Sequence, residues 1–492
     1  MLTFLIGIVI LCVGGLTYGK ICEKAMKPSD KKTPAVEKYD GVDYVPMKKW
    51  KNSLIELLNI AGTGPILGPI QGILFGPIAF ITIPVGCVIG GAFHDYMCGM
   101  ISVRNDGEQM PSLVKRFLGK YMYALYNVIV CLLLLLLGVV FIYTPGDLFV
   151  TQILNQKSSL DNPVLWIVYG VIFAYYIIAT LLPIDKIIGR IYPVFGAILL
   201  LSAVGVFIGM FIKGYKLDEL WTGTVSFVNP YGDHFIPIFF VTVACGIVSG
   251  FHSTQATLIS RTISNEHEGR TTFYNMMILE GFIAMVWAAS AMGAVKLGLV
   301  TNDMLRNQTT SVVGIISKDM LGTIGGVIAI IGVIVLPVTS GDTALRSLRV
   351  MISDALHINK TKKRNKLILA IIIFIVVALI LIYAKADSNG FNVLWRYFSW
   401  ANETTAVFAF SMICAYMIKN KMPYIMALIP GMFYMFIVCS YILNARIGFN
   451  LSWNISYILS GVLTVAYGCL LIIYGRSKIE QHPKMNSVKM KT

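Results

Sequence analysis

Long apolar runs alternate along this chain with short segments rich in Lys and Arg. Each run is long enough for a helix that crosses a hydrocarbon core of roughly 30 Å, which takes about 20 residues. Within the runs, apolar residues follow one another directly, whereas the strands of a membrane β-barrel alternate apolar and polar residues. The pattern therefore predicts an all-α, polytopic membrane protein and excludes a β-barrel.

We expect about thirteen transmembrane helices, because that number places every basic loop on one side of the membrane. By the positive-inside rule this side is the cytoplasm, which puts the N-terminus outside and the C-terminus inside. We interpret the first run as a retained helix rather than a signal peptide, since it lacks a preceding basic residue and a small-residue cleavage site. The expected segments are an N-terminal helix (1–19), a basic cytoplasmic loop (20–52), a first five-helix block (53–213), a second five-helix block (234–418), two further helices (423–474) and a cytoplasmic tail (475–492).

A cluster of glycine and proline interrupts the run after the basic loop. Residues 59–69 contain three glycines and two prolines, with polar residues beside them. Proline removes a backbone donor and clashes with the preceding turn, so a regular helix cannot continue there. One such residue often means only a kink or close packing. A dense cluster persists in a bilayer only where protein buries it or where it lines a polar cavity, so we favour a binding site.

A second interrupted run, residues 242–255, combines glycines with many hydroxyl groups. The two interrupted runs begin corresponding five-helix blocks and cross in opposite directions, which predicts a 5+5 inverted repeat. Paired broken helices in inverted halves point to a transporter's binding site, because helix N-termini attract anions and freed carbonyls bind cations. The candidate substrate-binding residues are Gly62, Thr63, Gly64, Pro65, Gly68, Gln71, Gly246, Ser249, Gly250 and His252.

Ionisable and oxygen-bearing residues inside other runs are candidates for ion coupling. Residues 336–346, at the expected inner end of the ninth span, offer hard oxygen ligands for a cation, or equally a capped helix end with an interfacial Asp–Arg pair. Glu280 lies well inside the eighth span and either changes charge during transport or is a structural, hydrogen-bonded carboxyl. We expect His94 and Asp95 to anchor the interface near Arg104 rather than take part in coupling.

Composition supports this class of protein and argues against others. Hydrophobic residues make up 56% of the 492 residues and charged residues 13%, too few charges for the surface of a soluble protein. The net charge of +15 comes from residues near helix ends, so we expect no nucleic-acid partner. The nine cysteines and six histidines show no zinc-type spacing, so we expect free, buried thiols and no enzyme active site.

The interrupted segments and several others resemble the carbon starvation protein A family. The resemblance rests on residues 60–69, 91–95, 103–107, 244–252, 339–346 and 394–402. It implies an uptake transporter of the inner membrane, associated with nutrient limitation and with import of peptides or pyruvate, in the amino acid–polyamine–cation superfamily. It also implies a LeuT-like fold, in which a Thr/Ser pair on the eighth core helix binds an ion beside the first broken helix. Here that pair would be Thr339 and Ser340.

We therefore expect a secondary active transporter that imports peptides or a small carboxylate such as pyruvate by alternating access, coupled to H⁺ or Na⁺. The candidate coupling residues are Ala61, Thr339, Ser340, Asp342 and Glu280, with a Na⁺ site at the first three. We expect no other cofactor, and the substrate and the lipid bilayer as partners. The alternative is a membrane nutrient sensor or signalling receptor, which would need a cytoplasmic output domain.

Overall fold

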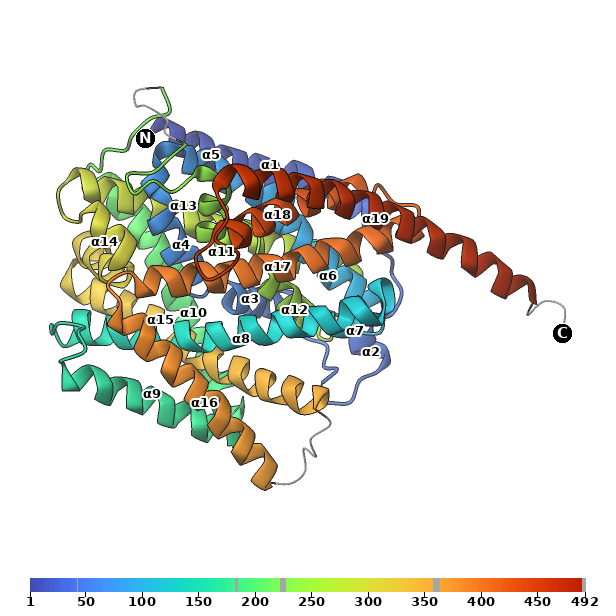
Figure 1. The fold of residues 1–492 in the computed structure, drawn as a ribbon, viewed down its shortest axis with the longest axis horizontal. Helices are drawn as coiled ribbons and strands as arrows, with labels where there is room; N and C mark the ends of the chain where they lie inside the picture. The colour runs from blue at the N-terminus through green and yellow to red at the C-terminus, as the bar shows by residue number, and fades with distance from the viewer. Residues whose placement is uncertain (42, 182–184, 222–226, 357–362, 489–492) are drawn as a thin grey trace.

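The chain is all-helical in the computed structural model (Figure 1), as predicted. The structure describes residues 1–41, 43–181, 185–221, 227–356 and 363–488, and within these ranges β-structure is limited to isolated bridges. The helices, in chain order, are α1 (Leu2–Met26), α2 (Pro34–Glu37), α3 (Lys49–Ile60), α4 (Gly64–Gly72), η1 (Ile73–Ile78), α5 (Ala79–Gly86), η2 (Cys87–Gly91), α6 (Ala92–Arg104), α7 (Met110–Leu118), α8 (Lys120–Leu148), η3 (Phe149–Ile153), α9 (Pro163–Leu181), α10 (Asp185–Ile212), η4 (Phe235–Phe239), α11 (Phe240–Ile247), α12 (Gly250–Ile259), η5 (Glu266–Glu268), η6 (Arg270–Tyr274), α13 (Asn275–Lys296), α14 (Asn302–Asn307), α15 (Thr309–Ala355), α16 (Lys363–Ala386), α17 (Gly390–Lys419), α18 (Ile425–Asn444) and α19 (Trp453–Val488).

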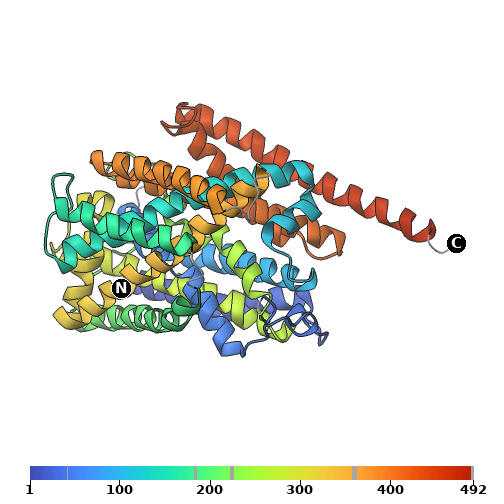
Figure 2. The ribbon, with the colours of Figure 1, turned by 90° about the horizontal axis from the view of Figure 1, so that it is seen from below.

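Ten helical segments within the described ranges are long and apolar enough to cross a membrane, and two shorter apolar ones cover Pro163–Ala179 and Gly196–Ile212. The axes of most helices are roughly aligned, so the helices form a bundle, which Figure 2 shows from a second side. The polytopic, all-α class is thus confirmed, while the count of thirteen spans and the inverted repeat stay predictions. All nine cysteines are free thiols, although Cys12 and Cys469 are exposed rather than buried.

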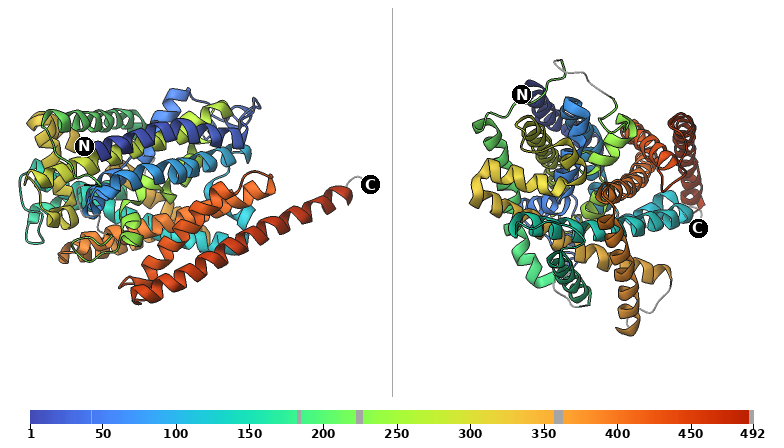
Figure 3. Two further views of the ribbon diagram at one scale, coloured as in Figure 1. Left: turned by 90° about the horizontal axis from the view of Figure 1, so that it is seen from above. Right: turned by 60° about the vertical axis from the view of Figure 1, so that its left-hand side comes forward.

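The second interrupted run lies in the centre of the bundle. In the most apolar stretch of the spans Phe235–Ile259 and Gly390–Lys419, 89% of the residues are buried, against 28% in the corresponding stretch of Trp453–Ser477. Helix α4 packs against α11 and α13, and α17 packs against both α11 and α12. The right panel of Figure 3 places α19 at the edge of the bundle. Broken helices are therefore surrounded by protein, as the cost of free backbone groups in lipid requires.

The segment 336–346 is not at a helix end. It lies inside α15, which continues to Ala355, so the expectation of a capped inner end is wrong. Helix α15 continues beyond the apolar stretch although Pro337 lies inside it, and the hydroxyl of Tyr176, on α9, donates to the carbonyl of Pro337 at 3.2 Å. Contacts with neighbouring helices make such a proline tolerable inside a membrane. The interruption of α15 lies instead at Gly322, whose φ of 70° and ψ of 177° are not helical.

The basic loop folds back onto the segment that follows α12. The hydroxyl of Thr33 donates to the carbonyl of Ile263 at 2.5 Å, and the backbone N–H of Met47 donates to the carbonyl of Thr262 at 2.9 Å. The backbone N–H of Ser29 donates to Glu266 at 2.8 Å. The loop is therefore bound to the end of the second broken helix at several points.

Candidate functional site

The first break separates α3 from α4. Helix α3 ends at Ile60, and α4 begins at Gly64 after a short non-helical link. Close packing of α4 on α11 explains a glycine of the cluster: a Cβ on Gly68 would lie 2.7 Å from the carbonyl oxygen of Thr242. Any larger residue would force the two backbones apart, so the sequence specifies this helix contact.

The second break separates α11 from α12. Val248 and Ser249 between them are extended, with φ of −148° and −131°. The side chain of Asn402, on α17, accepts from the backbone N–H of Phe251 at 2.9 Å and donates to the hydroxyl of Ser249 at 2.9 Å. Asn402 thus supplies the cap that the start of α12 lacks in its own sequence. A Cβ on Gly250 would lie 2.3 Å from the backbone carbonyl oxygen of Asn402, so only glycine fits here.

The two breaks face one small cavity, which α8, α15 and α17 complete. Its volume is about 30 Å³, room for little more than one water molecule. Ordinary ligand pockets measure about 300–1,000 Å³, so the cavity is too small to hold a substrate in this conformation. The cavity is lined by Asn59, Ile60, Gly62, Thr63, Gly64, Leu137, Phe141, Cys245, Ser249, Phe251, His252, Ser340, Phe398 and Asn402.

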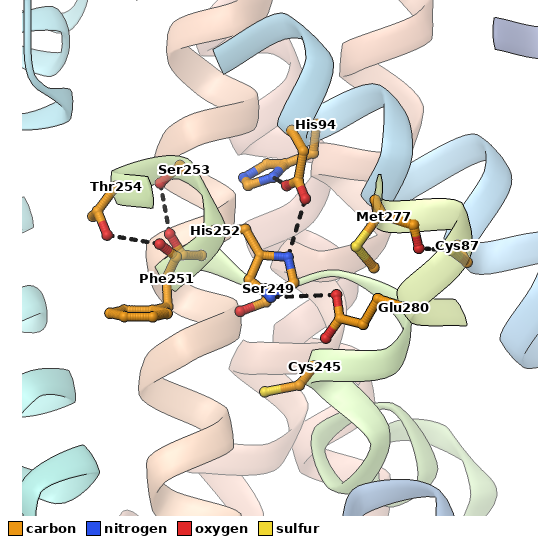
Figure 4. Close-up of polar contacts among 12 residues, drawn as sticks. Cys87, His94, Cys245, Ser249, Phe251, His252, Ser253, Thr254, Met277 and Glu280 are labelled. Atoms are coloured by element: carbon orange, nitrogen blue, oxygen red, sulfur yellow. Dashed lines mark hydrogen bonds and ion pairs between the residues drawn. The ribbon is translucent and has the colours of Figure 1, made fainter. Parts of the chain in front are cut away.

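A chain of buried ionisable side chains begins at the cavity wall. His252 lies between carboxylates of two other helices: its Nδ1 is 3.0 Å from Oδ2 of Asp95, and its Nε2 is 3.5 Å from Oε2 of Glu280. The Nδ1 of His94 is 2.7 Å from Oδ1 of Asp95. Each of these side chains is at most 1% exposed. Figure 4 shows His252 between His94 and Glu280.

Another carboxyl group belongs to the same electrostatic cluster. Glu56, on α3, is fully buried, interacts electrostatically with Asp95 and Glu280, and has no hydrogen-bond partner among the described residues. Three carboxylates in a dry site cannot all be charged unless cations compensate them. The imidazole of His252 contacts both Asp95 and Glu280, and that of His94 contacts Asp95, whereas Glu56 has no hydrogen bond to either imidazole.

The structure contradicts the expectation that His94 and Asp95 anchor an interface near Arg104. Asp95 is inside the protein, because α12, α13 and α17 pack against α6. Arg104 instead pairs with Glu266 at 2.8 Å. Three further buried polar residues were not among the site candidates predicted from the sequence: Glu56, Asn402 and Glu403. Each is a polar residue inside a helix that crosses or borders an apolar run, which is the signal that would have found them.

The other predicted residues divide between the cavity and the packing around it. Of the ten substrate candidates, Gly62, Thr63, Gly64, Ser249 and His252 line the cavity, whereas Pro65, Gly68, Gly246 and Gly250 lie in the adjoining helices. Gln71 donates to the hydroxyl of Thr309 at 3.0 Å and lies outside the cavity lining.

Among the coupling candidates, Ser340 lines the cavity and Ala61 is buried at the end of α3. Asp342 is buried and accepts a hydrogen bond from Thr343 at 2.9 Å. Thr339 belongs to α15, but the position of its side chain is outside what the structure describes.

A separate buried ion pair joins α8 to α16. The Nζ of Lys385 is 2.6 Å from Oδ1 of Asp147, and both side chains are less than 10% exposed. Thr310, at the start of α15, donates to Oδ2 of Asp147 at 2.7 Å, and Ser158 donates to its other oxygen. These contacts connect three helices outside the cavity lining.

Asp233 and Arg396 tie the start of the second broken helix to α17. Arg396 donates two hydrogen bonds to Asp233, at 3.1 and 2.6 Å. Burial raises the pKa of the Asp233 carboxyl, but the hydrogen bonds and charge of Arg396 outweigh it, and the pKa lies below its usual range.

This lowered pKa predicts how the stability of the protein depends on pH. The Asp233 carboxylate stabilises the fold fully above its unfolded pKa of about 3.9, and that contribution is lost as the pH falls through the lowered folded pKa. We expect Asp233→Asn to cost about 1.5–3 kcal/mol at pH 7, the usual range for hydrogen bonds to charged groups. The unfolding midpoints of both proteins in detergent, from pH 7 to pH 3, should converge at acid pH. A difference that stays constant over this range would contradict the assignment.

Comparison with known proteins agrees with a transport role. The family model described as Carbon starvation protein CstA matches residues 1–157, 142–301 and 303–441. An uncharacterized membrane protein of Haemophilus influenzae is 42% identical over 331 residues, which cover 58% of this chain and 89% of that protein. The peptide transporter CstA of Escherichia coli K12 is 26% identical over 317 residues, and the pyruvate/proton symporter BtsT of the same strain is 23% identical over 331. The aligned regions cover 45% and 46% of these two relatives, so the chain spans about half of their length.

Solved structures of a membrane transporter have a fold similar to that of this chain. The crystal structure of a mutant form of the Eremococcus coleocola manganese transporter superposes with a TM-score of 0.61 and covers 90% of this chain and 98% of its own. A second mutant form gives a TM-score of 0.60. Sequence identity is 12% in both cases, so the likeness concerns the fold of a membrane transporter and not its cargo.

Proposed function

The chain belongs to the carbon starvation protein CstA family, and we propose that it is a secondary active transporter that imports a peptide or a small carboxylate such as pyruvate by alternating access. One observation carries the proposal: two broken helices face a single cavity, and a chain of buried ionisable groups starts at its wall. We place the protein in the inner membrane with the N-terminus outside, since this orientation leaves the basic loops in the cytoplasm.

We assign the carboxylate of the substrate to the start of α4. Thr63 is the N-cap of this helix, but its hydroxyl makes no capping hydrogen bond and has no partner among the described residues. It is also 99% buried, since only 1% of the residue is exposed. The start of α12, by contrast, is already capped by Asn402. A helix N-terminus with an unpartnered hydroxyl suits an anionic group.

We assign proton coupling to Asp95, His252 and Glu280. His252 both lines the cavity and contacts the two carboxylates, so a substrate that excludes water or adds negative charge beside it shifts the protonation of the cluster. One relative, the pyruvate/proton symporter BtsT, supports a proton over a sodium ion. The second candidate is Na⁺ at Ala61, Thr339 and Ser340, favoured by the position of Ser340 on the cavity wall.

Uptake into proteoliposomes tests this function. The purified protein should accumulate labelled pyruvate or a labelled dipeptide when an inward proton gradient is imposed, and a sodium gradient alone should have no effect. Accumulation that depends only on sodium would replace the proton assignment with the Na⁺ site. No uptake of either class under either gradient, with a folded protein, would contradict the proposed function.

Thr63→Ala should weaken substrate binding without unfolding the protein. A hydrogen bond to a charged group contributes about 1.5–3 kcal/mol, so we expect KM to rise about 10-fold or more. The matched control is Thr82→Ala, because the Thr82 hydroxyl donates to the carbonyl of Ile78, the residue just before its own helix α5, and lies outside the cavity lining. Equal KM values for the two variants would remove Thr63 from the substrate site.

A further inference from the structure

A wide apolar groove runs between α8, α17, α18 and α19, away from the central cavity. Its volume is about 680 Å³, and it is lined almost entirely by apolar side chains. Met122 and Leu125 of α8 form one wall and Leu470 of α19 the other, while Trp400 and Phe408 of α17 lie between them. None of these residues belongs to the proposed transport site.

The groove opens toward the hydrocarbon of the membrane. All four helices belong to segments apolar enough to cross a bilayer. The walls are exposed on the protein surface, with 49% of Leu125 and 66% of Leu470 accessible. In a bilayer, acyl chains can fill such a groove. They then make van der Waals contacts with the groove walls, which the walls of an empty groove would lack. A flexible hydrocarbon chain also needs no hydrogen-bond partner from these walls.

One end of the groove is strongly basic. Lys120 lies 5.0 Å above the ring of Tyr121, which lines the groove, and Lys419 lies 5.9 Å above the ring of Phe117. A Cβ on Gly119 would lie 3.5 Å from the hydroxyl of Tyr474, so α19 meets the corner between α7 and α8 at this end. Besides Arg116, the exposed cations at this end include Lys115, Lys120, Lys419 and Arg476.

These four cations have no carboxylate partner in the described part of the chain, whereas the neighbouring Arg116 pairs with Glu108. Clustered Lys and Arg beside a membrane helix attract anionic lipid headgroups. We propose that the groove binds an anionic phospholipid, with an acyl chain along Trp400 and the phosphate among Lys115, Lys120, Lys419 and Arg476. The apolar length and the basic end occur together, which a groove for a second protein copy would not require.

Fluorescence quenching by brominated phospholipids tests the site in the full-length protein. The signal of Trp400 is the difference between the wild-type protein and Trp400→Phe in bilayers of the same composition. We expect brominated phosphatidylglycerol to quench this difference at a several-fold lower mole fraction than brominated phosphatidylcholine. Lys120→Gln/Lys419→Gln should remove most of that preference. The control Lys20→Gln/Lys24→Gln removes two exposed cations from α1 and should leave the preference for phosphatidylglycerol unchanged.

Two results of the quenching experiment would overturn the proposal. If neither lipid quenches Trp400, protein covers the groove, as in a dimer of this chain. If both lipids quench it equally, the basic end does not select a headgroup. Native mass spectrometry of the purified protein gives a second readout that does not depend on Trp400→Phe: retained phosphatidylglycerol should fall several-fold in Lys120→Gln/Lys419→Gln, and unchanged retention would also overturn the site.

Discussion

An Asp95→Asn protein should lose proton-driven substrate accumulation by about 100-fold or more, yet still exchange substrate across the membrane. The substitution keeps the shape of the side chain and removes the charge that lies 3.0 Å from Nδ1 of His252. An amide cannot gain and lose a proton as a carboxyl group does, and removing a positioned proton-transfer group typically costs about 10²–10⁴-fold. The measurement compares uptake of labelled pyruvate under an inward proton gradient with counterflow without a gradient.

The control for this prediction is Asp319→Asn. Asp319 is partly exposed, accepts a hydrogen bond from Tyr215 at 2.9 Å and lies 3.6 Å from Lys213, outside the cavity lining. The Asp319→Asn protein should accumulate substrate as the wild-type protein does. If Asp95→Asn also accumulates substrate at the wild-type level, the buried cluster is structural and another group couples transport to the gradient.

The second large effect concerns stability. Lys385→Met should destabilise the protein by about 3–5 kcal/mol, because Asp147 would remain buried without its cation. Adding Asp147→Leu should restore much of the loss, since an apolar pair of similar volume replaces the two charges. Unfolding midpoints of the two single variants, the double variant and the wild type in detergent measure the coupling.

An exposed pair provides the comparison for Lys385. Lys213, which is 48% exposed, lies 3.6 Å from Asp319, and Lys213→Met should cost less than about 1 kcal/mol. If Lys385→Met costs no more than Lys213→Met, or if the double variant loses the sum of the single losses, the contact between α8 and α16 is not a coupled ion pair.

The sequence predicts the broken helices well because their cause is local. Glycine and proline do not readily continue a regular helix, and the structure ends α3 at Ile60 and begins α4 at Gly64, although Gly68 and Pro69 lie inside α4. The glycines also record close packing, as the approach of Gly250 to the Asn402 backbone illustrates. Identifying His252 and Glu280 as ionisable residues inside apolar runs required only the residue type and its place in the run.

Tertiary packing decides what the sequence could not. Asp95 lies near the end of an apolar run, so counting loop charges placed it at an interface, whereas α12, α13 and α17 bury it. No pattern within α6 records which helices cover it. Asn402 caps a helix about 150 residues away in the chain, and such a contact becomes visible only when the two helices are placed side by side. The continuation of α15 to Ala355 likewise depends on packing, since α8, α9 and α10 contact this helix.

Substrate-driven proton movement tests the central claim most directly. Proteoliposomes with an internal pH indicator receive pyruvate or a dipeptide without any imposed gradient. The proposed coupling through Asp95, His252 and Glu280 predicts that the interior acidifies as substrate enters with the wild-type protein, and that Asp95→Asn abolishes this signal while counterflow persists. Substrate entry with the wild-type protein and no change of internal pH would contradict it.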